Sequence, residues 1–249
     1  MCILPVKPAG NIGRNATMSS KKATENFTGG GAAPVAGGRQ RLMEAALRIG
    51  ASRRSLQSLG LRELAREAGL NPNTFYRHFN SLEELSLAII DELGRDLRSN
   101  LRGIRRTVRS PVAEATPRTI EYVFDFAAHN PDAFIVAVRE LHGAMPTVRE
   151  ALQRMIADVT QEMVEDVQFL NIGPALEEAT LRDISHTVVT HVFHQTLDYI
   201  EYPTRRTQIL RQTVRFIDML FVGAALMQTL KAGTMAEVLE RAATLMPRK

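Results

Sequence analysis

Residues 61–79 read Leu61-Arg-Glu-Leu-Ala-Arg-Glu-Ala-Gly-Leu-Asn-Pro-Asn-Thr-Phe-Tyr-Arg-His-Phe79, and this segment carries the strongest structural signal in the chain. It predicts two short helices joined by a tight turn. Gly69 favours the end of the first helix, because glycine adopts the left-handed conformation without a Cβ clash. Asn71 followed by Pro72 favours the start of the next helix. The small residue Ala65 suits the point where two helices cross, so the segment is typical of a helix-turn-helix.

The second helix of this motif is expected to have one apolar and one polar face. Phe75 and Phe79 are four residues apart and should both face inward. Hydrogen-bonding side chains then remain outside, and they are Asn73, Thr74, Tyr76, Arg77 and His78. Such groups suit the base edges and phosphates of a DNA major groove, and Asn71 with the first free amides can add an anion site. We therefore expect double-stranded DNA as a partner, with a buried helical hairpin of an enzyme as the alternative.

Charge is distributed unevenly along the chain. The net charge is +4, yet residues 39–109 carry 14 basic groups, all arginine, against 8 acidic ones, whereas residues 110–249 carry 13 against 18. A basic front and an acidic back predict a polyanionic partner at one end only, because phosphate contacts release counterions. A mixed-charge solvated surface, or an adaptor that binds a protein partner through its basic front, would also fit.

Helical periodicity predicts an all-α fold in three parts. Residues 1–38 are rich in glycine and small polar residues and are expected to form a flexible tail. Residues 39–100 should form a three-helix DNA-binding domain, in which Ser81 and Glu84 make a capping box for a long helix. Residues 101–249 should form a helical domain that binds an effector and dimerises.

Composition argues against several other classes of protein. Cys2 has no second cysteine to pair with, so neither a disulfide framework nor a cysteine metal site is expected. No apolar stretch is long enough to cross a bilayer and no export signal is visible, which favours a cytoplasmic location. The usual motifs of hydrolases, metalloproteases and phosphate-binding enzymes are missing as well. We expect no catalysis, no cofactor and no metal.

Residues 39–85 resemble the N-terminal domain of TetR-family regulators, most closely in Phe75-Tyr-Arg-His-Phe79. The resemblance implies a three-helix DNA-binding domain followed by a dimerising, effector-binding helical domain. It assigns phosphate or base contacts to Thr74, Tyr76 and His78, and sequence specificity to Asn73 and Arg77. Two positions depart from the family pattern. Gly60 replaces a frequent Ser or Thr cap, and Leu82 replaces a frequent Lys. Those contacts to the DNA backbone are therefore either missing or supplied by Arg62 and Arg41.

The chain is further similar to the branch of this family that represses genes of unsaturated fatty-acid synthesis or desaturation. The similarity rests on Leu61–Gly69, Phe75–Phe79, Asn130-Pro-Asp-Ala-Phe134 and Val138-Arg-Glu140. It implies a fatty acid or acyl-CoA effector. Regulation of an efflux or catabolic gene by a non-lipid molecule, and activation instead of repression, remain open.

An enclosed effector needs apolar lining, which the back half can provide. The candidate lining residues are Phe124, Phe126, Phe134, Phe169 and Phe193, with Arg139 as the partner of a thioester or phosphate. At helical spacing the same aromatic residues also suit an ordinary core.

Two long helices near the end of the chain, about 175–201 and 204–231, suit a four-helix interface in a homodimer. A homodimer in turn predicts a palindromic operator. Packing within one chain is the alternative, and both can hold. His191 and His194 share a face of the first of these helices, where packed histidines are a simpler interpretation than a metal site.

Overall fold

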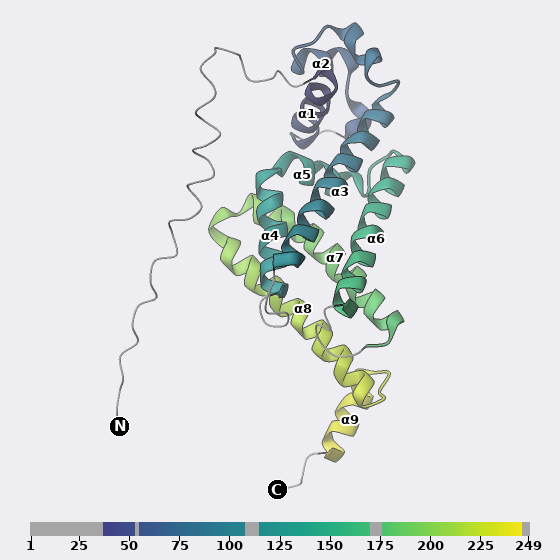
Figure 1. Cartoon of the computed structure of the whole chain (residues 1–249), viewed down its shortest axis with the longest axis vertical. Helices are drawn as coiled ribbons and strands as arrows, with labels where there is room; N and C mark the ends of the chain where they lie inside the picture. The colour runs from purple at the N-terminus through teal and green to yellow at the C-terminus, as the bar shows by residue number, and fades with distance from the viewer. Residues whose placement is uncertain (1–36, 53–54, 108–114, 170–175, 246–249) are drawn as a thin grey trace, which may run out of the picture. The chain divides into compact units, whose positions relative to one another are not determined.

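The computed structural model describes residues 37–52, 55–107, 115–169 and 176–245, and within these ranges every regular element is a helix (Figure 1). The all-α prediction is confirmed. In chain order the elements are α1 (Gly38–Ala51), η1 (Leu56–Ser58), α2 (Leu61–Glu67), η2 (Pro72–Arg77), α3 (Leu82–Thr107), α4 (Ala115–His129), α5 (Pro131–Glu140), α6 (Pro146–Phe169), α7 (Glu178–Glu201), η3 (Pro203–Arg205), α8 (Arg206–Thr229) and α9 (Met235–Leu245).

Two of the predicted domain boundaries, after residues 38 and 100, can be compared with the helices of the structure. The tail predicted for residues 1–38 lies outside the described residues except for Gly37 and Gly38, and Gly38 already belongs to α1. The boundary placed after residue 100 falls inside α3, which is continuous through it. One long helix therefore belongs both to the predicted DNA-binding domain and to the helices behind it.

The helix ends around the turn follow the sequence signals. Gly69 has a φ of +62°, the left-handed conformation expected just after a helix. The Asn71 side chain accepts a hydrogen bond from the Asn73 amide at 3.0 Å, and Pro72 occupies the first helical position. The helix that follows is a 3₁₀ helix, tighter than the α-helix that the pattern suggested.

The start of α3 is capped in a way that differs from the predicted reciprocal box. Ser81 Oγ accepts a hydrogen bond from the Glu84 amide at 3.1 Å, as expected. The Glu84 carboxyl, however, reaches one residue further back and accepts from the Asn80 amide and the Asn80 side chain, each at 2.8 Å. The cap therefore includes Asn80.

The hydrophobic core is shared between the helix-turn-helix and the helices behind it. Leu42, Leu64 and Phe75 are fully buried and belong to the same apolar cluster as Val148 of α6 and Phe134 of α5. Burial of one such side chain stabilises a fold by about 1.5–3 kcal/mol. A continuous core means that α5 and α6 support the DNA-binding helices directly.

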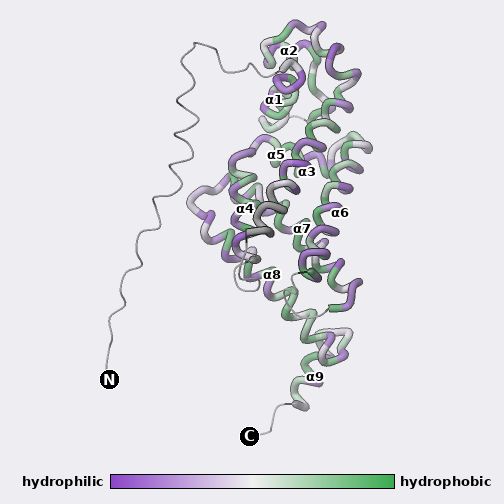
Figure 2. Tube along the Cα trace, in the orientation of Figure 1, coloured by the Kyte–Doolittle hydropathy of each residue, from purple (hydrophilic) through white to green (hydrophobic). Residues whose placement is uncertain are grey.

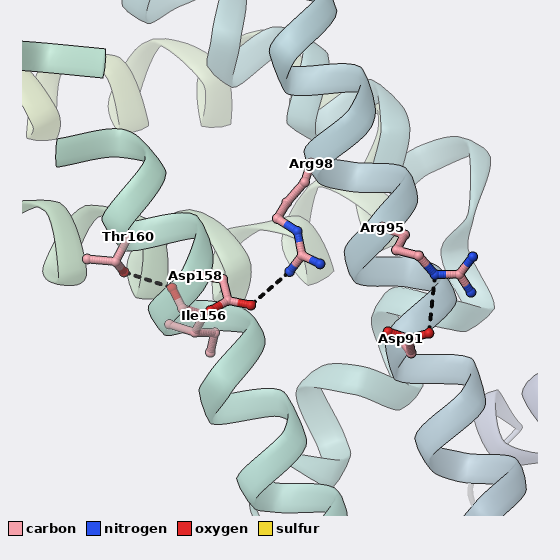
Figure 3. Close-up of polar contacts among 6 residues, drawn as sticks. All are labelled: Asp91, Arg95, Arg98, Ile156, Asp158 and Thr160. Carbon is pink, nitrogen blue, oxygen red and sulfur yellow. Dashed lines mark hydrogen bonds and ion pairs between the residues drawn. The ribbon is translucent and has the colours of Figure 1, made fainter. Parts of the chain in front are cut away.

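Polar contacts also connect α3 with α6, as Figure 3 shows. Arg98 of α3 forms an ion pair with Asp158 of α6 at 3.0 Å. Arg95, one turn earlier, pairs instead with Asp91 of its own helix at 3.2 Å and stays on the solvent side. The Arg98 pair therefore adds to the apolar packing between these two helices, whereas the Arg95 pair does not.

A second apolar cluster joins α4, α7 and α8 around Tyr199. The Tyr199 ring stacks on Phe124, with centroids 4.8 Å apart, and its hydroxyl donates to Asp125 at 2.9 Å. The Arg206 guanidinium lies 4.9 Å from the centroid of the Tyr199 ring and donates to the Tyr199 carbonyl at 3.0 Å. Each of these contacts joins α7 to a neighbouring helix.

Candidate DNA-binding surface and sensor core

The outward side of η2 is fixed by two buried phenylalanines. Phe75 and Phe79 are 0% and 1% exposed, and their ring centroids lie 6.0 Å apart. Tyr76, between them, is 64% exposed. Asn73 and Arg77 are exposed as well, and Thr74 and His78 are half-buried. These five residues, all expected to contact DNA, thus lie on η2 or directly after it, and the buried phenylalanine pair anchors this segment to the core.

The remaining predicted DNA contacts have distinct local roles. Arg62 is exposed at the start of α2. Asn71 is exposed too, but its side-chain oxygen already caps η2. Arg41 is half-buried and donates to the Gly69 carbonyl at 2.9 Å. The Arg41 guanidinium therefore braces the turn of the motif.

The start of α1 supports the far end of η2, which sequence reasoning missed. The Arg39 guanidinium lies 4.4 Å from the centroid of the Phe79 ring and donates to the His78 carbonyl at 3.4 Å. Gly38 lies directly against the His78 imidazole. Residue spacing gives no signal for such a contact, because it joins positions about 40 residues apart by tertiary packing.

The contacts of Asn80 and Arg39 at the start of α3 also affect the pKa of Glu84. The two hydrogen bonds from Asn80, first that from its amide and then that from its side chain, lower the pKa of Glu84 from its ordinary value, and Arg39 contributes in the same direction. On the other side of the motif, Arg48 of α1 pairs with Glu67 of α2 at 2.9 Å. Both ends of α1 are thus connected to the helix-turn-helix.

Three of the aromatic residues expected to line an effector cavity lie together. Phe134 contacts both Phe126 and Phe193, with ring centroids 5.9 Å apart in each case. Phe124 lies elsewhere, stacked on Tyr199. Phe169 is 87% exposed at the end of α6 and touches none of these rings in the described structure. The group formed by Phe126, Phe134 and Phe193 is hereafter called the sensor core.

Arg139 lies apart from the sensor core and contacts α1. Its guanidinium donates to the carbonyls of Gly50 and Ala51, at the end of that helix. Carbonyls at a helix C-terminus lack intrahelical partners and carry partial negative charge, so a guanidinium suits them well. This geometry gives no support to the expected contact between Arg139 and an effector.

Glu140, the next residue, is 2% exposed and was not singled out from the sequence. Its Oε1 accepts a hydrogen bond from the Leu56 amide of η1 at 2.8 Å. Glu140 also lines a cavity of about 10 Å³ beside Leu56, Ile90 and Val136, enough for one water molecule. The sequence did contain a signal for Glu140, because this carboxyl lies at the end of a mainly apolar helix.

The histidines on α7 have ordinary partners. His191 lies 4.3 Å from the Phe216 ring, and His194 contacts the Thr190 carbonyl at 2.8 Å. Burial, and then the neighbouring His194, lower the pKa of His191. In the part of the chain that the structure describes, no three potential metal ligands gather in one place, and no helix is long and apolar enough to cross a membrane.

Residues 42–89 match the family model of the bacterial regulatory proteins of the tetR family. Solved structures resemble the fold over most of its length. A tetR-family transcriptional regulator from Streptomyces coelicolor superposes with a TM-score of 0.61 at 17% identity, covering 85% of this chain and 90% of that one. The fatty acid degradation regulator FadR from Bacillus halodurans gives 0.60 at 12% identity, covering 76% and 97%. FadR from Bacillus subtilis, solved in complex with stearoyl-CoA, gives 0.54 at 14% identity, covering 74% and 98%.

Proposed function

We propose that this chain, a TetR-type DNA-binding transcriptional regulator by its residues 42–89 and its fold, is a homodimeric repressor that a small hydrophobic effector releases from DNA. The observation that carries the proposal is the display of Asn73, Tyr76 and Arg77 on η2, above the buried Phe75–Phe79 pair. Exposed groups of this kind on a rigidly anchored element can read base edges.

Roles can be assigned from how each side chain is placed. The side chains of Asn73 and Arg77 are exposed and form no hydrogen bond found among the described residues of the motif, so they are the candidates for base contacts. Thr74, Tyr76 and His78 are candidates for phosphate or base contacts, and Arg62 for phosphates. The first amides of η2 are not free to bind an anion, because Pro72 has no N–H and the Asn73 and Thr74 amides both donate to Asn71. Asn71 and Arg41 act on DNA indirectly, through the cap and the turn that they stabilise.

Dimerisation was expected through α7 and α8, but apolar residues of α7 such as Val188 and Val192 are buried within their own chain. The interface is therefore proposed on α8 and α9. These helices leave large apolar side chains in solvent, and Figure 2 shows hydrophobic stretches along both. The exposed residues are Met219, Val222 and Leu226 on α8, and Met235 and Leu239 on α9. Contiguous exposed apolar residues mark interaction surfaces. A twofold pairing of these faces would bury them and present two η2 elements to a palindromic operator.

A fatty acid or acyl-CoA is the proposed effector. The sensor core supplies contiguous apolar surface, and the similar FadR of Bacillus subtilis was solved with stearoyl-CoA. In the described structure these rings pack on one another. An acyl chain must therefore displace at least one ring, which gives binding a direct route to rearranging α5.

The DNA assignment is tested by selecting duplexes from a random library with the purified protein. We expect a palindromic consensus and an affinity for it that falls steeply with salt. Tyr76→Ala should weaken binding about tenfold or more, whereas Tyr202→Ala, which removes an exposed ring from the end of α7, should not. Recovery of no consensus by the wild-type protein would contradict the assignment.

The effector is tested separately, by denaturing purified protein and identifying any retained small molecule by mass spectrometry. A retained fatty acid or acyl thioester supports the lipid effector. An unrelated compound would instead favour an efflux or catabolic regulator. Transcription from the selected operator, with and without the protein, distinguishes repression from activation.

A further inference from the structure

The end of α5 contacts the segment before the helix-turn-helix through two adjacent side chains of opposite charge. Arg139 donates to the carbonyls that close α1, and Glu140 accepts from the amide that opens η1. These two residues with Gly50, Ala51 and Leu56 are called the α5 anchor. In chain order the anchor lies between α1 and α2, the first helix of the motif.

The Leu56 amide needs a hydrogen-bond acceptor from outside its own helix. Leu56 is the first residue of η1 and is itself buried, so its amide has neither an intrahelical acceptor nor free access to water. Ser55 caps the next amide, that of Gln57, and leaves Leu56 to another acceptor. Glu140 Oε1 is that acceptor, which makes the position of η1 depend on the position of α5.

The other oxygen of Glu140 is what makes this contact unusual. Among the described residues, Oε2 has no hydrogen-bond partner, and it packs so closely on Gly143 that a methyl group there would lie 2.1 Å away. The contact with η1 is therefore made by Oε1 alone, with the Leu56 amide as its donor.

The same short helix contacts the sensor core. Phe134 lies in the first turns of α5 and Glu140 at its end, about 9 Å along the axis at 1.5 Å per residue. Because both residues lie on this one short helix, a shift of the α5 backbone that accompanies displacement of the Phe134 ring would also shift the Glu140 carboxyl.

From this geometry we propose that Glu140 is a positioning residue for DNA recognition, which fixes η1 and thereby the helix-turn-helix relative to α5. The proposal rests on the DNA-binding function proposed above. It makes α5 the connection between the sensor core and η1, through Phe134 and Glu140. Arg139 has the supporting role, at the end of α1.

The test compares Glu140→Leu, which removes the acceptor, with Glu140→Gln, which keeps it. Glu150→Gln, at an exposed carboxyl of α6, is the matched control. Three quantities are measured on the full chain: hydrogen exchange of fragments containing Leu56, affinity for the selected palindrome, and affinity for a scrambled duplex at low salt. Nonspecific affinity depends on charge and not on exact placement, so it reports the amount of folded, basic protein.

We expect Glu140→Leu to accelerate exchange at Leu56 and to lower affinity for the palindrome about tenfold, with scrambled-duplex affinity within about twofold. Glu140→Gln and Glu150→Gln should stay within about threefold of wild type on both duplexes. A merely structural role would lower both affinities together, along with the folded fraction, and would overturn the proposal. So would unchanged exchange at Leu56 in Glu140→Leu. If the wild-type protein itself prefers no sequence, the DNA-binding proposal fails instead, and the two failures are distinguishable.

Discussion

Gly38 and His78 are packed so closely that a Cβ at residue 38 would lie 2.4 Å from Nε2 of His78. The contact joins the first residue of α1 to the residue that ends η2. His78 is one of the side chains proposed to contact DNA. The lack of a side chain at Gly38 therefore helps to set where that imidazole lies.

Gly38→Ala should separate DNA binding from stability. Alanine is a better helix residue than glycine by up to about 1 kcal/mol, so the free energy of unfolding should hold or rise slightly. The imidazole must rotate away from the new methyl group, and affinity for the selected palindrome should fall several-fold. Gly37→Ala is the control, because a Cβ there meets nothing within 4 Å. Equal affinity of both variants would show that the position of His78 is unimportant for recognition.

Gly69→Ala should destabilise the fold by about 1–2 kcal/mol, because a residue with a side chain must adopt the left-handed conformation that glycine holds at φ +62°. Gly69→Asn should cost less, since asparagine tolerates this conformation better. The free energy of unfolding from urea denaturation measures both. A Cβ at residue 69 would also lie 2.6 Å from the Arg41 guanidinium, so both variants must displace that side chain. A cost for alanine no greater than that for asparagine would therefore mean that the left-handed conformation does not decide the cost.

Stability should decrease in alkali because of Tyr199. Burial, and then the hydrogen bond to Asp125, raise the pKa of Tyr199 to about 12. The unfolded chain loses this proton near its ordinary value of about 10. The contribution of Tyr199 is therefore complete below pH 10 and is lost as the pH rises from there toward 12.

Tyr199→Phe is the variant that isolates this effect. It should cost about 1 kcal/mol at neutral pH, through the lost hydrogen bond to Asp125, and should flatten the alkaline part of the stability profile. Urea denaturation between about pH 8 and 11.5 gives both values. Tyr76→Phe, at a tyrosine that is 64% exposed, controls for tyrosines in general. An alkaline profile unchanged in Tyr199→Phe would assign the loss to other groups.

The helix-turn-helix could be predicted almost residue by residue because its determinants are local. Gly69, Asn71 and Pro72 act on the backbone within a few residues of themselves, and the four-residue spacing of Phe75 and Phe79 fixes one face. These signals depend little on the rest of the chain. The capping box failed in its second half because Asn80, just outside the pattern, offers the Glu84 carboxyl two donors.

Contacts between distant segments could not be predicted in the same way. Arg139 was expected to pair with the thioester or phosphate of an effector, yet it contacts the end of α1, nearly 90 residues earlier in the chain. Similarly, Phe169 is of the same residue type as the members of the sensor core, but it lies at the end of α6 and is exposed. Residue type indicates what a side chain can bind, whereas only tertiary packing determines which of several suitable partners it meets.

Val222→Asp should break the proposed dimer. Val222 is 66% exposed and lies in the middle of the apolar row on α8, so a charge there would be buried without a partner in a twofold interface. The single chain should stay folded, because the side chain contributes little to the core of its own subunit. Thr207→Asp adds the same charge at an exposed position near the start of α8 and serves as the control.

Sedimentation should then give a dimer for wild type and Thr207→Asp and a monomer for Val222→Asp at micromolar concentration. Affinity for the full palindrome should fall by about 100-fold or more, because two linked half-site contacts become independent. Affinity for an isolated half-site should change little, since η2 is untouched. A Val222→Asp protein that remains dimeric would place the interface on another face, and a wild-type monomer that binds the palindrome tightly would remove the symmetry argument for the operator.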